Sequence, residues 1–419
     1  MTTLTASSSR PADVAFAVAA TLVAVMLFLV GWGVLHRGFF ADDPIVDTPT
    51  YQRYGSAMDE GQLPYRDFAL EYPPGALTVF LIPALGNPGF ETFRVRFEAL
   101  TAFFGEAMIV CVAVALVALG ASRRRLLMAL GFVSLAPVLL GPVVLSRFDL
   151  WPAALTAAAL CALVTGRFRL GHVALGAAVL AKLYPAVLAP VTVAYVWKRE
   201  GRREALVCAG LMLAVVALVL APFVAVAPDG VWDSLWNQAS RPLQIESLGA
   251  GILLVARHVF GTGITVETSH GSQNLAGTAP DVLAVLQSVV QAAALVATWV
   301  LFARGPASRS RLLLASAAAL VAFVSLGKVL SPQFLIWLIP VIPLVAGRRG
   351  LTASALLAAA LLLTQLWFPY RYWELALQLG TLESWLVLVR DLVLVALFAW
   401  LAWPLLDREP ERLAARRAP

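Results

Sequence analysis

Repeated apolar runs, each close to the roughly 20 residues that a helix needs to cross a bilayer, constrain this chain more than any other feature. Short clusters of Arg, Lys, Pro and Gly separate them. Hydrophobic residues make up 60% of the 419 residues and charged residues 13%, too apolar a mixture for a water-soluble core of this size. The runs cover 14–35, about 92–120, 126–145, 150–165, 204–227, 281–303, 311–327, 332–346, 351–368 and 384–405.

The runs predict an all-α polytopic membrane protein with about 10–12 membrane helices in one domain. The expected organisation is a cytoplasmic N-terminus at 1–13, a transmembrane domain at 14–405 and a basic cytoplasmic tail at 406–419. Two longer segments, 36–91 and 228–280, are rich in aromatic and acidic residues and are expected to be outer loops that carry the function. The short run 75–85 predicts a helix that lies at the outer interface.

Orientation follows from basic clusters that directly flank the apolar runs. The positive-inside rule places them in the cytoplasm, so both termini of a multi-pass plasma-membrane protein are expected inside. This distribution accounts for the net charge of +6 without a nucleic-acid partner. The clusters are Arg123, Arg124 and Arg125; Arg167 and Arg169; Lys198, Arg199, Arg202 and Arg203; Arg304, Arg309 and Arg311; Arg348 and Arg349; and Arg408, Arg412, Arg416 and Arg417.

The segment 170–197 begins and ends at cytoplasmic clusters, so it must cross the membrane an even number of times. Lys182, Tyr184 and Pro185 lie at its centre, and proline disfavours helix in the residue before it. We therefore predict two short helices that meet at Lys182-Leu183-Tyr184-Pro185, a kind of break that usually lines a cavity. The alternative is one long helix whose neighbouring loop violates the charge rule.

The first outer loop reads FFADDPIVDTPTYQRYGSAMDEGQLPYRDFALEYPPGAL and opens directly after the first run. A carboxylate near the membrane surface, screened from water by aromatic residues, gains proton affinity and can act as a general base on an acceptor hydroxyl. Asp47 is the candidate base, and Asp67 and Glu71 are candidate substrate-binding acids. The alternative is that these acids only solubilise the loop.

Charged residues at the expected outer ends of helices, or at the membrane break, form a second group: Arg147 and Asp149 in SRFDLWP, Lys182 in KLYP, Lys328 in GKVLSPQF and Arg371 in PYRYWEL. Cations on the outer side oppose the positive-inside bias, which suggests that they bind an anion such as a phosphate. The alternative is interhelical ion pairing, for example of Arg147 with Asp149 or of Lys328 with a loop acid.

The segment SRPLQIESLGAG places Arg241, Gln244 and Glu246 just before an apolar stretch. A guanidinium, an amide and a carboxylate suit sugar hydroxyls or a phosphate, but the segment could equally be a capped amphipathic element. The sequence contains no phosphate loop, dinucleotide fingerprint or His/Cys metal-ligand spacing, so neither a cofactor nor a metal site is expected.

With these residues the chain resembles the actinobacterial membrane mannosyltransferases of glycosyltransferase family 87, within the C superfamily of polyprenyl-phosphate-sugar-dependent enzymes. The resemblance covers nearly the whole chain. It rests on Asp47 followed at the family spacing by Tyr51, and on GQLPYRDFALEYPPGAL, SRFDLWPA, AKLYPAVLAP, RPLQIESL and KVLSPQF.

The resemblance implies a C-superfamily fold with an outer-face cavity and a cell-envelope enzyme that transfers mannose from a polyprenyl-phosphate sugar to a lipid or glycan acceptor with inversion. Asp47 then becomes the catalytic base. Tyr51, Tyr184 and Gln333 join the acids, cations and amide above as expected substrate-binding residues. Asp42 and Asp43 compete with Asp47, because many superfamily members have an acidic pair in this loop. A transporter or flippase is the alternative function, and an acyltransferase is disfavoured because no histidine has a fitting acidic neighbour.

Overall fold

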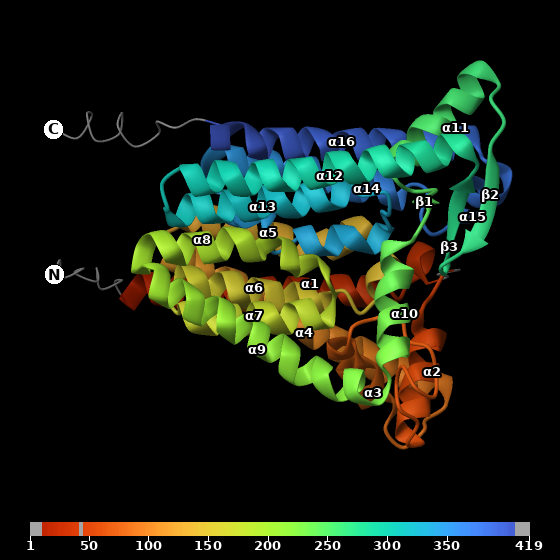
Figure 1. Cartoon of the computed structure of the whole chain (residues 1–419). Coiled ribbons are helices and arrows are strands. Elements are labelled where there is room, and N and C mark those ends of the chain that lie inside the picture. The colour runs from red at the N-terminus through yellow and green to blue at the C-terminus, as the bar shows by residue number, and fades with distance from the viewer. Residues whose placement is uncertain (1–10, 42–44, 407–419) are drawn as a thin grey trace.

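The computed structural model describes residues 11–41 and 45–406, which form a bundle of helices running along one common direction (Figure 1). Helix α1 (Pro11–Val34) begins, and helix α16 (Thr381–Leu406) ends, at the same end of this bundle. The opposite end, which we call the loop end, carries the short helices and all described strands. The chain is therefore mostly helical, as predicted.

Five described helices are long and apolar enough to cross a membrane: α1, α4 (Phe90–Ala118), α9 (Arg202–Val226), α12 (Thr278–Arg304) and α16. Large apolar side chains cover their outer surfaces. Leu218 of α9 is 77% exposed and Val285 of α12 is 64% exposed. Surface of this kind is unfavourable in water, so lipid chains must be its solvent, and the protein is a membrane protein.

Shorter helices complete the bundle, and two of them, α6 (Leu150–Val164) and α13 (Arg309–Ser325), are buried on nearly all sides. Alanine supplies many of their buried positions, and its small side chain lets neighbouring backbones approach closely. Helix α6 packs against both α4 and α7. The remaining bundle helices are α5 (Arg123–Leu140), α7 (Phe168–Ala181), α8 (Ala189–Glu200) and α14 (Gly347–Gln365).

The expected break in 170–197 is present. Helix α7 ends at Ala181, Lys182 is extended with φ −162° and ψ 143°, and a 3-10 turn, η4 (Tyr184–Leu188), leads into α8. The chain turns back there, because α8 ends near the beginning of α7, away from the loop end (Figure 1). Two short helices that meet at the KLYP sequence are confirmed, and the single long helix is wrong.

The run 332–346 does not form the single spanning helix that its hydropathy predicts. It consists of two 3-10 turns, η5 (Pro332–Leu338) and η6 (Ile342–Leu344), and most of its side chains are buried. Pro340 and Pro343 explain the difference, because proline lacks the amide hydrogen of an α-helical bond and clashes with the preceding turn. Protein surrounds this irregular backbone, which is the condition under which it is tolerated at membrane depth.

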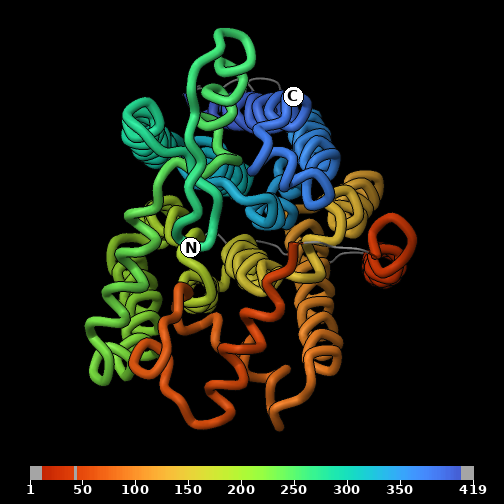
Figure 2. Tube along the Cα trace, turned by 90° about the vertical axis from the view of Figure 1, so that its right-hand side faces the viewer, coloured from red at the N-terminus to blue at the C-terminus, as the bar shows by residue number. Residues whose placement is uncertain are grey.

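The loop end is built from stretches that are far apart in the sequence. Viewed onto this end, the stretch 45–89 crosses one part of the bundle and the strand region lies over another (Figure 2). Helix α10 runs across the direction of the bundle (Figure 1). The helical elements here are η1 (Gly38–Phe40), α2 (Thr48–Asp59), η2 (Pro74–Ala76), α3 (Leu77–Ala84), η3 (Pro142–Val144), α10 (Pro228–Ala239), α11 (Leu248–Phe260) and α15 (Tyr372–Gln378).

A small antiparallel sheet at the loop end departs from the all-α prediction. Its strands are β1 (Leu243–Gln244), β2 (Thr265–Ser269) and β3 (Ser272–Ala276) in the order β1-β3-β2, with Leu243 opposite Leu275 and Thr265 opposite Ala276. His270 and Gly271 connect β2 to β3 with φ 54° and 67°. Two positive φ values give a tight hairpin turn that matches strand twist. Strands this short lie below what hydropathy patterns detect.

The basic clusters lie at the end of the bundle opposite the loop end. Their side chains donate hydrogen bonds to backbone carbonyls at the ends of neighbouring helical segments. Arg125 Nη2 donates to the Leu344 carbonyl at 2.7 Å and Arg311 Nη2 to the Leu405 carbonyl at 2.9 Å. Lys198 Nζ donates to the Gly305 carbonyl at 2.5 Å. Cations gathered at one end fit the predicted orientation, which stays a prediction. Residues 1–10 and the tail arginines lie outside the described residues.

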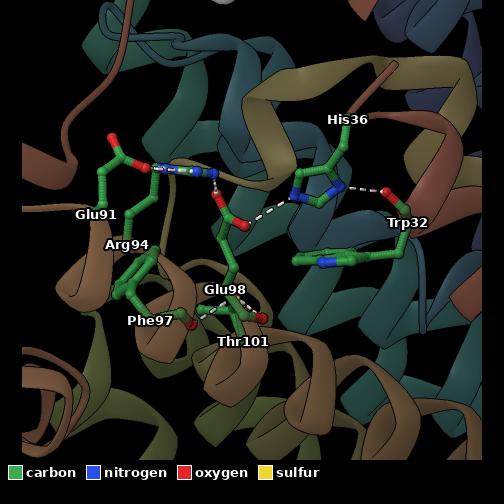
Figure 3. Close-up of polar contacts among 7 residues, drawn as sticks. All are labelled: Trp32, His36, Glu91, Arg94, Phe97, Glu98 and Thr101. Atoms are coloured by element: carbon green, nitrogen blue, oxygen red, sulfur yellow. Dashed lines mark hydrogen bonds and ion pairs between the residues drawn. The ribbon is translucent and has the colours of Figure 1, made fainter. Parts of the chain in front are cut away.

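Polar contacts tie α1 to α4 near the loop end (Figure 3). His36 Nε2 lies 2.8 Å from Glu98 Oε2, and Arg94 Nη1 donates to Glu98 Oε1 at 2.9 Å. The other ring nitrogen of His36 lies 2.8 Å from the Trp32 carbonyl oxygen. Glu91 pairs with Arg94 at 2.8 Å. Glu98 therefore links the end of the first membrane helix to the start of the next long one.

Candidate functional site

Six ionisable side chains from distant segments gather at the loop end, and we call them the ionic cluster. Asp47 precedes α2, Arg147 precedes α6, and Lys182 lies at the break between α7 and α8. The positions of these three residues are set locally, because each lies at, or within a few residues of, the end of a helix. The cluster consists of Asp47, Glu71, Arg147, Lys182, Arg241 and Glu246.

Asp47 is held by two neighbours. Its Oδ2 atom lies 3.1 Å from Arg147 Nε and accepts a hydrogen bond from the Tyr51 hydroxyl at 3.2 Å. The contact with Tyr51 explains the four-residue spacing, because residues i and i+4 share a helix face. The Asp47 side chain is 36% exposed, so its carboxylate is only partly screened from water. Asp42 and Asp43 lie outside the described residues.

Asp149 and Lys182 form a buried ion pair, in which Lys182 is a member of the ionic cluster. Lys182 Nζ lies 2.7 Å from Asp149 Oδ1, which also accepts a hydrogen bond from Trp337 Nε1 at 2.6 Å. The sequence suggested Arg147 as a partner of Asp149, but the partner is Lys182. Because Asp149 neutralises the ammonium group, Lys182 belongs to a paired site and is not an isolated cation.

Aromatic rings surround the Lys182 ammonium. Its Nζ atom lies 4.6 Å from the ring centre of Phe148, 5.3 Å from that of Trp337 and 5.9 Å from that of Tyr72. Tyr184 stacks on Trp337 with ring centres 4.1 Å apart, and its hydroxyl lies 3.1 Å from Thr156 Oγ1. Tyr184 therefore supports the wall of this aromatic box.

Gln244 lies in β1, and Arg241 and Glu246 flank this strand along the chain. Arg241 Nη2 donates to Ser272 Oγ at 3.0 Å. Gln244 Nε2 donates to the Glu246 carboxylate and to Ser331 Oγ. Burial raises the pKa of Glu246 to about 8, although the nearby arginines, including Arg241, oppose this rise. The segment therefore brings a carboxyl group of raised pKa within electrostatic reach of the Arg241 guanidinium.

Glu71 lies between the Asp47 and Lys182 side of the ionic cluster and Arg241. Burial raises the pKa of Glu71 and Asp47 raises it further, while Arg241 and Lys182 lower it. These four groups are therefore within electrostatic reach of one another. Lys328 joins them, because burial and the positive charge of Arg241 lower the pKa of Lys328. Its Nζ atom donates to the Ala239 carbonyl at 3.1 Å.

Three predicted substrate-binding residues, Asp67, Arg371 and Gln333, are not members of the ionic cluster. Asp67 pairs with Arg66 at 2.8 Å on the surface and accepts a bond from the Leu63 amide at 2.7 Å, so it shapes the loop. Arg371 pairs with Glu383 at 2.9 Å. Gln333 is half-buried in η5.

The sequence did not predict Tyr72 and Tyr372 as site residues, although both interact electrostatically with carboxyl groups of the ionic cluster. Burial raises the pKa of both tyrosines, and Glu71 raises that of Tyr72 further while Glu246 raises that of Tyr372 further. Both tyrosines directly follow residues that the motifs had singled out, Glu71 and Arg371. Their neighbours along the chain were therefore an available signal.

Arg390 and Asp391 were also missed, in the middle of the last membrane helix. Both side chains are fully buried, with Arg390 Nε 2.6 Å from Asp391 Oδ1. Arg390 Nη2 also donates to the Glu246 carbonyl at 2.8 Å. Adjacent charges within LVLVRDLVLV were the available signal, because charges inside a membrane helix are costly and are usually functional.

No group of three or more His, Cys, Asp or Glu side chains in the ranges 11–41 and 45–406 is placed to hold a metal ion. The arrangement instead offers one half-exposed carboxylate, several buried cations and an aromatic box. Comparison with protein families and with curated proteins gives no match to this chain.

Proposed function

We propose that this membrane protein is a glycosyltransferase that moves a hexose, with mannose the first choice, from a polyprenyl-phosphate sugar to a lipid or glycan acceptor at the outer face of the plasma membrane with inversion. Asp47 acts as the general base. The placement of Asp47 carries the proposal: its carboxylate lies at the more exposed side of a cluster whose cations, Arg147 and Lys182, are more buried.

The chemistry needs one base and one site for a departing phosphate. The acceptor oxygen attacks the anomeric carbon of the sugar while Asp47 takes the proton of that hydroxyl. The bond from the anomeric carbon to the phosphate oxygen breaks, and polyprenyl phosphate leaves with the electron pair. Arg241 and Lys328 then face the phosphate charge, and Arg147 and Tyr51 orient the Asp47 carboxylate.

Replacement of Asp47 by Asn tests the proposal. The amide keeps the size of the side chain but cannot accept the proton, so transfer from polyprenyl-phosphate mannose should fall by roughly 100- to 10,000-fold. Radiolabelled sugar transfer by purified protein in liposomes measures this rate. Asp42→Asn and Asp43→Asn are the matched controls and should keep most of the activity. Wild-type turnover by Asp47→Asn would disprove the assignment of the base.

A transporter or flippase is the second candidate, because the broken pair of α7 and α8 carries a buried Lys182–Asp149 ion pair near its turn. The same liposomes separate the two functions. Movement of a labelled polyprenyl-phosphate sugar between leaflets, without formation of a new glycosidic bond, would favour transport and exclude the enzyme.

A further inference from the structure

An open groove of about 790 Å³ lies at the loop end between the first outer loop and α10. One wall comes from residues 65–71, the other from α10, and the turn between β2 and β3 borders it. Tyr54 of α2 lines the same groove. A volume in the range of about 300–1,000 Å³ holds ligands larger than a single sugar ring.

The lining chemistry suits a neutral polyhydroxylated ligand. Phe68 and Trp236 supply aromatic surface, and Asp233, Asn237 and His270 supply hydrogen-bonding groups. Aromatic faces pack against the apolar faces of sugar rings, while carboxylates and amides bind hydroxyl groups.

The charges in the groove disfavour an anion. Arg66 is neutralised by Asp67 at 2.8 Å, and the other lining carboxylates, Glu71 and Asp233, are negative when ionised. A phosphorylated ligand would be repelled here, whereas the cations of the ionic cluster would attract it. The groove therefore favours a neutral ligand, whereas the ionic cluster favours a phosphate.

Glu71 joins the groove to the ionic cluster. It lines the groove, and Asp47, Lys182 and Arg241 all contribute to its pKa. Its backbone carbonyl accepts a hydrogen bond from Gln238 Nε2 of α10 at 3.1 Å, which fixes the two walls to each other. A ligand in the groove thus lies next to the cluster that contains Asp47.

We infer that this groove binds a neutral oligosaccharide and is the route by which a glycan acceptor reaches the ionic cluster from the aqueous side. The binding site stands on the geometry above, and its role as the acceptor site rests on the proposed glycosyltransferase function. The acceptor class is then a glycan, either free or as the headgroup of a lipid.

The test measures binding of mannotriose and mannotetraose to purified full-length protein in nanodiscs, without donor, by isothermal titration calorimetry. Trp236→Ala should weaken binding about tenfold, as loss of one aromatic contact implies. Trp232→Ala is the matched control, because Trp232 is also exposed on α10 and stacks on Trp236 at 6.3 Å but does not line the groove. Its affinity should stay within about threefold of wild type. Asn237→Ala should weaken binding as well.

Equal affinity of wild type and both groove variants would overturn the inference, as would tighter binding of mannose 6-phosphate than of mannotriose. Size-exclusion profiles check that each variant is folded. The outcome is separable from the proposed function: if no oligosaccharide binds but wild-type protein still transfers mannose to another acceptor, only the groove assignment fails. If Trp236→Ala loses binding but Asp47→Asn transfers normally, the groove stands and the base assignment falls.

Discussion

Glu246 illustrates at the scale of one residue how burial changes chemistry in this protein. Its side chain is buried, its carboxylate accepts a bond from Gln244, and its backbone carbonyl accepts one from Arg390. Burial penalises the charged form and raises the pKa of Glu246 from its ordinary value of 4.5 to about 8. A neutral carboxyl group can donate as well as accept hydrogen bonds, which suits sugar hydroxyls.

This pKa predicts a pH dependence of stability. Between pH 4.5 and about 8 the folded protein keeps the Glu246 proton while the unfolded chain releases it, so stability falls as the pH rises through this window. The slope from this group is at most about 1.4 kcal/mol per pH unit. Glu246→Gln should flatten the decline of melting temperature between about pH 5.5 and 7.5, measured by fluorescence. Glu267→Gln on exposed β2 is the control and should keep the wild-type decline.

Individual helices are tied to the rest of the molecule by a few buried or partly buried polar contacts. Helix α16 reaches the segment around Glu246 through Arg390, whose guanidinium also lies 5.7 Å from the ring centre of Trp367. Helix α1 reaches α4 through His36 and Glu98. In an apolar surrounding such contacts hold elements in register, because an unpaired group would be costly.

Removal of one charge in α16 should therefore cost more than removal of both. Arg390→Met leaves Asp391 buried and unpaired and should destabilise the protein by about 3–5 kcal/mol. The double change Arg390→Met with Asp391→Leu should recover much of this loss. Thermal unfolding of the purified variants checks the order. A double variant less stable than Arg390→Met would contradict the pairing argument.

The contact between α1 and α4 makes a similar prediction at smaller magnitude. Glu98→Gln weakens the bonds to both His36 and Arg94 and should cost about 1.5–3 kcal/mol, as expected for hydrogen bonds to charged groups. Glu91→Gln is the matched control, because Glu91 is exposed and forms a surface pair with Arg94, which predicts less than about 1 kcal/mol. Denaturation midpoints of the two variants should differ accordingly. Equal losses would show that Glu98 does not hold the helices together.

On the scale of the whole molecule, the ionic cluster and the groove share the loop end, while the basic clusters share the other end (Figure 1). This separation of charge and function along the bundle axis fits a protein that faces two compartments. The positive-inside rule assigns the basic end to the cytoplasm.

Cysteine labelling tests that assignment. Gln62 follows α2 at the loop end, and Glu200 is the last residue of α8 at the other end; both are exposed, and each is replaced by Cys in one variant. A membrane-impermeant maleimide added to intact cells should label Gln62→Cys and spare Glu200→Cys, until the cells are permeabilised. Cys111, Cys161 and Cys208 are replaced by Ala in both variants to remove background. The reverse labelling pattern would place the proposed site in the cytoplasm.

The sequence by itself determined most of the long membrane helices, because a membrane helix satisfies its own backbone hydrogen bonds within one continuous apolar run. The runs 14–35 and 204–227 correspond closely to α1 and α9, and Pro185 correctly marked the break. The run 332–346 failed because hydropathy does not register the effect of its prolines.

Only the tertiary structure decided which charges meet. Asp149 pairs with Lys182, 33 positions away, and Arg390 binds the carbonyl of Glu246, 144 positions away. The groove likewise needs walls from residues 54–71 and 230–240. Such partners depend on how helices distant in the chain pack against each other. A local pattern encodes the helix but not the neighbour, so the candidate residues were readable in the sequence while their pairing was not.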